Sequence, residues 1–100
     1  MSILSEILKE EYERINSTLS SFEALAAGLP KGSIREKLIN GKKYPYLQWR
    51  ENGKVRSKYV RPDNIIALSE QIEQRRQYEK EIKSLREAKK EFDRVIGKGL

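Results

Sequence analysis

Apolar residues recur every three or four positions through the first quarter of the chain. This spacing places them along one side of a helix with about 3.6 residues per turn. Ser2 is a candidate cap for its start. Gly28 followed by Pro30 ends the pattern, because glycine accepts the left-handed cap conformation and proline cannot continue a helix. We therefore predict a helix from about Ser2 to Ala27, within residues 1–28, that buries a stripe made of Leu4, Leu8, Tyr12, Ile15, Leu19, Phe22 and Ala26.

The pattern then changes to alternating strand-like runs separated by two Asn-Gly pairs, Asn40-Gly41 and Asn52-Gly53. Asn-Gly is a strong signal for a two-residue hairpin turn, because both central residues of a type I′ turn need a positive φ. Two such turns predict a three-stranded antiparallel meander over residues 31–61, with strands Ser33–Ile39, Lys42–Glu51 and Lys54–Val60.

The two-residue turns also set the register of the predicted sheet. One face then presents Arg35, Lys37, Tyr44, Tyr46, Gln48, Arg50, Ser57 and Tyr59. The other face, which we expect to pack on the helices, presents Ile34, Leu38, Leu47, Trp49 and Val60, interrupted by Arg56 and Lys58. Pro45 removes a hydrogen-bond donor from the middle strand. A bulge there, with a slip of one residue, would exchange the two faces.

A second helical pattern begins near Pro62 or Asp63 and runs to about Ile96, within residues 62–97. Proline and acidic residues in the first turn are typical of a helix start. Arg75 and Arg76 interrupt its apolar stripe, either as part of a solvated face or as contacts to a backbone phosphate or to a partner's acidic groups. The stripe itself comprises Ile65, Leu68, Ile72, Tyr78, Ile82, Leu85, Phe92 and Ile96.

Helix, meander and long helix together predict one α+β domain over residues 1–100. At 1.5 Å per residue the two helices are much longer than so small a sheet can cover. Their stripes must bury against each other, as an antiparallel hairpin or coiled coil, or against a second copy of the chain. The pattern therefore favours a helical hairpin and leaves a homodimer through the helices open.

Composition argues against several classes of function. The chain has no cysteine and no histidine, so it lacks disulfides, the commonest zinc ligands and the commonest general base. Its acidic residues lie among lysines on helix faces, which are usually solvated. We therefore expect no enzyme activity, no catalytic residues, no cofactor and no metal. No signal peptide or membrane-spanning run is recognisable, so we expect a soluble, cytoplasmic protein without a membrane partner.

Positive charge is concentrated in the predicted sheet. Residues 31–61 hold ten basic and two acidic residues, whereas the net charge of the whole chain is +6. A small basic sheet rich in tyrosine is typical of a surface that contacts a polyanion. The candidate nucleic-acid-binding residues are Arg35, Lys37, Lys42, Lys43, Tyr44, Tyr46, Gln48, Arg50, Lys54, Arg56, Lys58 and Tyr59.

Two segments carry a resemblance to a known family. They are LPKGS, residues 29–33, and YPYLQWRENGKVRSKYV, residues 44–60. They resemble short uncharacterised proteins of bacteria and phages that are found in mobile elements. Those proteins place one helix before the hairpin and a long charged helix after it. The resemblance therefore implies the same layout here and no established activity.

The meander is also similar to the amino-terminal DNA-binding domains of phage and transposon integrases. These use a three-stranded sheet with a Tyr-x-Tyr or Trp-x-Tyr strand, a glycine turn and a basic third strand, and they place the sheet in the major groove. This chain differs by the long helix that precedes its sheet. The resemblance implies base or phosphate contacts by Arg35, Lys37, Tyr46, Gln48, Arg50 and Arg56.

Three functional hypotheses remain at this point. The first is a non-enzymatic nucleic-acid-binding protein, with DNA favoured over RNA. The second is a protein-interaction module of a phage or mobile element, such as an anti-CRISPR inhibitor that binds a Cas nuclease and blocks its guide RNA or target DNA. The third is a coiled-coil adaptor in which the tyrosines, as good strand formers, only cover the sheet.

Overall fold

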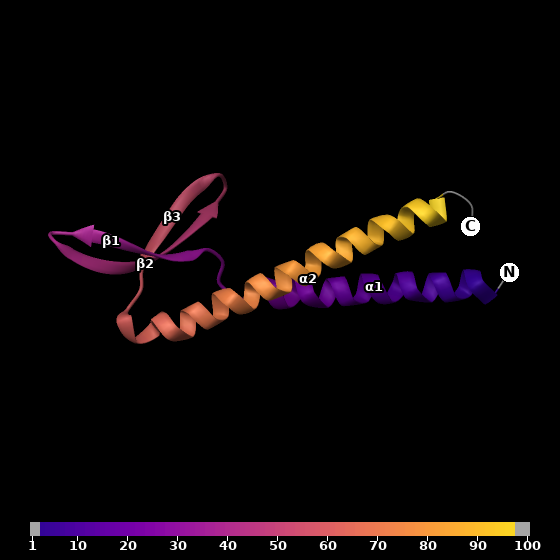
Figure 1. The fold of residues 1–100 in the computed structure, drawn as a ribbon, viewed down its shortest axis with the longest axis horizontal. Helices are drawn as coiled ribbons and strands as arrows, with labels where there is room; N and C mark the ends of the chain where they lie inside the picture. Colours follow the sequence, from indigo (N-terminus) through magenta and orange to yellow (C-terminus); the bar gives the residue numbers. More distant parts are fainter. Residues whose placement is uncertain (1–2, 98–100) are drawn as a thin grey trace. The chain divides into compact units, whose positions relative to one another are not determined.

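The computed structural model describes the backbone of residues 3–97 and the side chains of residues 3–95. Ser2, the predicted helix cap, and the side chain of Ile96 therefore lie outside the described part. The element order confirms the predicted α+β class: a helix, a three-stranded antiparallel sheet and a long helix (Figure 1). The elements are α1 (Ile3–Ala27), β1 (Ser33–Ile39), β2 (Lys42–Glu51), β3 (Lys54–Tyr59), a 3₁₀ turn (Pro62–Asn64) and α2 (Ile65–Gly97).

The chain divides into two compact units. The helical unit contains α1 and the part of α2 that follows Arg76. The sheet unit, Leu29–Arg76, contains the three strands and the first part of α2.

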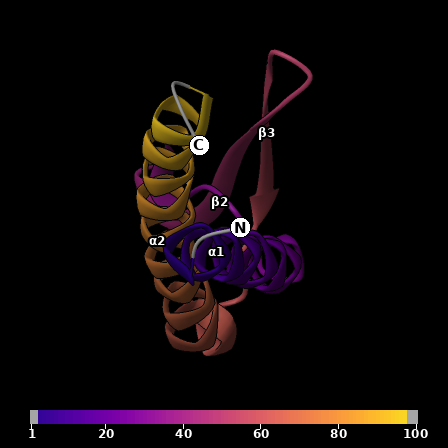
Figure 2. The same cartoon turned by 90° about the vertical axis from the view of Figure 1, so that its right-hand side faces the viewer.

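In the helical unit, α1 and α2 form the predicted antiparallel hairpin (Figures 1 and 2). Tyr12, early in α1, contacts Phe92 late in α2, with ring centroids 6.1 Å apart. Phe22, late in α1, contacts Tyr78, with centroids 5.6 Å apart. A buried core cluster of this unit is formed by Leu19, Ala26 and Ile82, with Phe22, Tyr78 and Leu85 packed against it.

A hydrogen bond ties the two helices together near the Tyr12 end of the hairpin. The Tyr12 hydroxyl donates to a carboxylate oxygen of Asp93 at 2.9 Å. This bond raises the pKa of Tyr12, because it stabilises the protonated phenol beside a negative charge. The predicted stripe is less complete than expected at this end: Leu4 is 62% exposed. The structure therefore corrects the burial of Leu4, and the covered stripe of α1 begins at the half-buried Leu8.

The segment between α1 and β1 is held by two arginines of α2. Arg75 donates from Nη1 to the carbonyl oxygen of Leu29 at 2.5 Å, and Arg76 donates from Nη2 to the carbonyl oxygen of Gly32 at 3.1 Å. The two arginines that interrupt the apolar stripe therefore bind backbone carbonyl groups of the segment that precedes β1. Neither sequence interpretation of the pair, solvated face or external contact, anticipated this role.

The left-handed cap predicted at Gly28 is absent. In the described residues the glycines with positive φ are Gly32, Gly41 and Gly53. The helix α1 still ends at Ala27, and Pro30, three residues later, cannot continue a helix.

The sheet has the order β1-β2-β3 (Figure 1). Both ladders keep the predicted register. Tyr46 lies opposite Arg35 in β1 and opposite Tyr59 in β3. Both turns have the positive φ angles that Asn-Gly favours: 51° and 78° at residues 40 and 41, and 52° and 76° at residues 52 and 53. The local turn chemistry therefore specifies the whole pairing scheme.

Pro45 does not cause a bulge, since β1 and β2 pair without interruption on both sides of it. Its carbonyl oxygen accepts a hydrogen bond from the Val60 amide at 3.0 Å. In an antiparallel ladder, a residue's amide and carbonyl point to the same neighbouring strand. The missing Pro45 donor therefore faces Val60, at the end of the β2–β3 ladder. This explains why β3 ends at Tyr59 and not, as predicted, at Val60.

The more apolar face of the sheet meets α2 over a limited area. Leu47 and Val60 line a common pocket with Leu68 of α2, and Val60 is buried. Leu38, on the same face but nearer the first turn, is 70% exposed. The expectation that this whole face packs on the helices is therefore wrong for the part of the sheet near the turn between β1 and β2.

Candidate nucleic-acid interface

Alternation along the strands divides the sheet into two surfaces. We call one the tyrosine face. Its members share the side of Tyr46; they are Ser33, Arg35, Lys37, Ile39, Lys42, Tyr44, Tyr46, Gln48, Arg50, Val55, Ser57 and Tyr59. We call the other the reverse face; its members are Ile34, Glu36, Leu38, Lys43, Pro45, Leu47, Trp49, Glu51, Lys54, Arg56 and Lys58.

Three tyrosines form a contiguous cluster on the tyrosine face. The rings of Tyr46 and Tyr59, which are cross-strand neighbours, have centroids 5.7 Å apart with an interplanar angle of 72°. Tyr44 reaches Tyr59 diagonally at 6.4 Å and 63°. Edge-to-face geometry of this kind is favourable for aromatic pairs. The cluster therefore stabilises the sheet and gives its surface a fixed shape.

Lys37 is held across this cluster by two contacts. Its ammonium nitrogen lies 4.4 Å from the centroid of the Tyr46 ring. The same nitrogen donates a hydrogen bond to the Ser57 hydroxyl at 3.0 Å. Lys37 lies on β1 and Ser57 on β3, so the side chain spans the middle strand. Ser57 was expected on this face but not among the site residues, although its position opposite Gln48 follows from the register.

The two faces differ in their charge. The tyrosine face carries four basic residues, Arg35, Lys37, Lys42 and Arg50, and no acidic residue. Both acidic residues of the strands lie on the reverse face. There Glu36 pairs with Lys43 at 3.9 Å and Glu51 pairs with Arg56 at 3.7 Å. The tyrosine face therefore carries positive charge alone, whereas the reverse face carries basic and acidic residues together.

The register divides the twelve predicted site residues between these faces. Eight of them share the tyrosine face: Arg35, Lys37, Lys42, Tyr44, Tyr46, Gln48, Arg50 and Tyr59. The other four, Lys43, Lys54, Arg56 and Lys58, lie on the reverse face and cannot act with the eight on one flat ligand. Two of these four are in the ion pairs with Glu36 and Glu51.

Two kinds of feature are absent from the described residues. Over residues 3–97, no cluster of three or more acidic side chains is arranged to hold a metal ion. Within the same range, neither helix combines the length and apolar character that crossing a membrane requires.

A comparison with protein families assigns the chain to one of them. The model of the family described as Domain of unknown function (DUF6788) matches residues 4–70. The match covers α1, the whole sheet and the first turns of α2, so the chain belongs to this family. No curated protein and no solved structure matches it.

Proposed function

We propose that this member of the DUF6788 family is a non-enzymatic nucleic-acid-binding protein that contacts DNA with its tyrosine face. The observation that carries the proposal is the separation of charge within the sheet. Four basic residues and no acidic residue share a face with the tyrosine cluster. Both acidic residues of the strands lie on the reverse face, where each forms an ion pair with a basic residue. Lysine and arginine side chains arranged in this way neutralise phosphates and release counterions.

The face also carries groups that can read base edges. Arginine binds the O6 and N7 acceptors of guanine, and glutamine binds the N6 and N7 groups of adenine, in the major groove. Gln48 and Arg50 are on the same face of the middle strand, and Arg35 is opposite Tyr46 on β1. Strands can enter the major groove as a unit. We therefore assign Arg35, Gln48 and Arg50 to base or phosphate contacts.

The geometry of Tyr44 and Tyr46 favours contact with duplex DNA over stacking of unpaired bases on these two rings. Stacking of an unpaired base needs an open ring face. Tyr44 and Tyr46 are half-buried, both contact Tyr59, and Lys37 covers one face of the Tyr46 ring. The similarity of the meander to integrase amino-terminal domains, and its resemblance to proteins of mobile elements, support the same preference. They are also consistent with a protein that acts in the cytoplasm of a bacterial host.

Fluorescence anisotropy with labelled double-stranded DNA, single-stranded DNA and structured RNA tests the proposal. We expect the wild-type protein to prefer the duplex. Four phosphate contacts would weaken binding about a hundredfold between about 50 and 200 mM salt. The variant R35E/R50E should lose most of this affinity and show a smaller salt dependence, because two cationic contacts become repulsive.

A matched variant separates the tyrosine face from general electrostatics. K54E/K58E changes the formal charge by the same amount but alters the reverse face. It should retain duplex binding, and circular dichroism should show that both variants remain folded. Equal losses in the two variants would contradict a face-specific contact. No binding of any nucleic acid at low salt would instead assign the tyrosine face to an acidic protein surface, such as that of a nuclease inhibited by this protein.

A further inference from the structure

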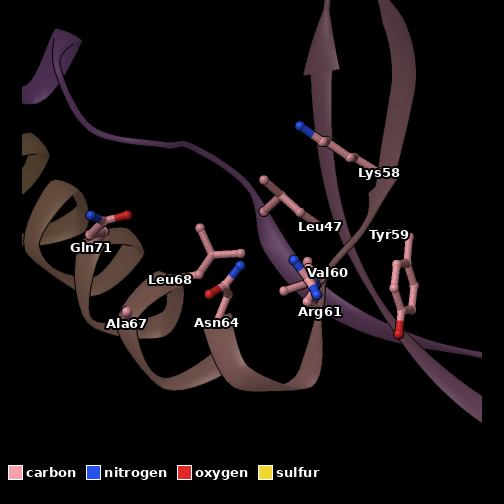
Figure 3. A pocket seen from close by; sticks show the side chains of 9 residues that line it. All are labelled: Leu47, Lys58, Tyr59, Val60, Arg61, Asn64, Ala67, Leu68 and Gln71. Atoms are coloured by element: carbon pink, nitrogen blue, oxygen red, sulfur yellow. The ribbon is translucent and has the colours of Figure 1, made fainter.

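A second surface of the sheet unit has a different chemistry. A pocket of about 450 Å³ lies between the reverse face of the sheet and the first turns of α2 (Figure 3). Leu47 and Val60 line it from the sheet side, and Ala67, Leu68 and Gln71 line it from α2. This volume is within the range of about 300–1,000 Å³ that is typical of ligand sites.

The floor of this pocket is apolar and already desolvated in part. Val60 is 6% exposed, and Leu47 and Leu68 are half-buried. A phosphate backbone would gain nothing from such a floor, whereas an aliphatic or aromatic side chain would bury apolar area against it. The pocket therefore favours a peptide or protein over a nucleic acid.

The rim of the pocket is cationic. Lys58 and Arg61 line it, both are exposed, and no acidic residue is among the lining residues. In the described part of the chain, neither side chain forms an ion pair, in contrast to Arg56 on the same face, which pairs with Glu51. An apolar floor beside two cations without carboxylate partners complements a segment that has both apolar and acidic side chains.

We propose that this pocket binds an acidic peptide segment of a partner protein. One apolar side chain of that segment occupies the space between Leu47 and Leu68, and its carboxylates lie beside Lys58 and Arg61. Tyr59 also lines the pocket and belongs to the tyrosine face. The inference does not rest on the proposed DNA contact, because it is argued from Leu47, Lys58, Arg61 and Leu68, none of which is on the tyrosine face. If both hold, the protein joins a nucleic acid on one face to a protein on the other.

Selection from a phage-displayed library of random 12-residue peptides tests this site on the full chain. The library is first depleted on the variant K58E/R61E and then selected on the wild-type protein. We expect enriched peptides that combine Asp or Glu with Leu, Ile or Phe. Failure to enrich any peptide family, or enrichment of peptides without acidic residues, would overturn the proposal.

Binding of a synthetic, fluorescein-labelled enriched peptide then locates the site. The Kd should rise by about tenfold or more in K58E/R61E, since favourable rim charges become repulsive. A67W, which fills the pocket from the exposed position of Ala67 on α2, should have a similar effect. R35E/R50E should bind the peptide as the wild type does.

The pattern of losses separates this inference from the proposed function. If R35E/R50E loses peptide binding while K58E/R61E retains it, acidic peptides bind to the tyrosine face, and the pocket assignment is overturned. If K58E/R61E loses as much affinity for duplex DNA as R35E/R50E does, the rim of the pocket belongs to a nucleic-acid-binding surface. This result would also overturn the pocket assignment. Peptide binding with no DNA binding would leave the pocket as the functional site and remove the proposed function.

Discussion

Gly32 is the residue at which backbone conformation and close packing coincide. Its φ is +108°, a region that side chains other than glycine rarely adopt. A Cβ added there would lie 2.2 Å from the Gln48 carbonyl oxygen and 3.0 Å from the Trp49 Cβ. Its own carbonyl accepts the hydrogen bond from Arg76. The loop before β1 is therefore held against the middle strand and against α2 by a residue with no side chain.

Substitution of Gly32 should thus be costly. We expect Gly32→Ala to lower the free energy of unfolding by about 2–4 kcal/mol, from backbone strain and from the clash with Gln48. Gly41→Ala is the matched control. Gly41 also has a positive φ, +78°, but has no atom within 4 Å of an added Cβ, so its cost should be about 1 kcal/mol. Urea denaturation measures both, and equal losses would contradict the packing argument.

Among the elements, the sheet was the most predictable and its contacts with the helices were the least. The Asn-Gly turns are local, so the bounds of β1 and β2 and the register of both ladders could be predicted from residues 33–60. The end of β3 could not, because it depends on which neighbour the missing Pro45 donor faces. The role of Arg75 and Arg76 was also hidden, since their acceptors are loop carbonyls more than forty residues earlier in the chain.

The account of Pro45 can be tested by restoring the donor. In the variant Pro45→Val, the new amide should donate to the Val60 carbonyl and extend the β2–β3 ladder by one pair. The gained hydrogen bond and the lost rigidity of proline in the unfolded chain offset each other, so stability should change by less than about 1 kcal/mol.

Hydrogen exchange followed by NMR reports directly on this amide. We expect the residue 45 amide of the variant to exchange slowly, with the amide of Tyr46 as an internal reference within the same strand. Fast exchange at residue 45 would show that the amide faces solvent, which would contradict the stated direction of the Pro45 backbone.

At the scale of the whole molecule, the distribution of charge on the sheet could be predicted from the sequence, whereas tertiary contacts could not. The grouping of Arg35, Tyr46 and Arg50 on one face follows from strand alternation and was predictable. The position of Lys37 above Tyr46 depends on a long side chain choosing one of many conformations. The pocket on the reverse face needs α2 to pass beside Leu47 and Val60, which no periodicity in the sequence encodes.

The gathered cations should make the stability of the protein depend on salt. Repulsion among Arg35, Lys37, Lys42 and Arg50 is screened as ionic strength rises. We expect the melting temperature of the wild type to increase by roughly 2 °C between about 20 and 200 mM NaCl. R35E/R50E should show little or no increase, because opposite charges then neighbour the remaining lysines. A fall in the wild-type melting temperature with salt would show that the paired charges outweigh the repulsion.

The two-residue turns of the meander have a further consequence for the order of folding. Each Asn-Gly turn closes a very short loop, whereas the contact between Tyr12 and Asp93 joins residues 81 positions apart. The entropic cost of closing a loop increases with the length of chain that is closed. Formation of the hairpins therefore costs little entropy, whereas pairing of the helices costs more. A meander that forms first removes the freedom of residues 33–59, about a third of the intervening chain. We therefore expect the small sheet to form first and to shorten the search of the two long helices for each other.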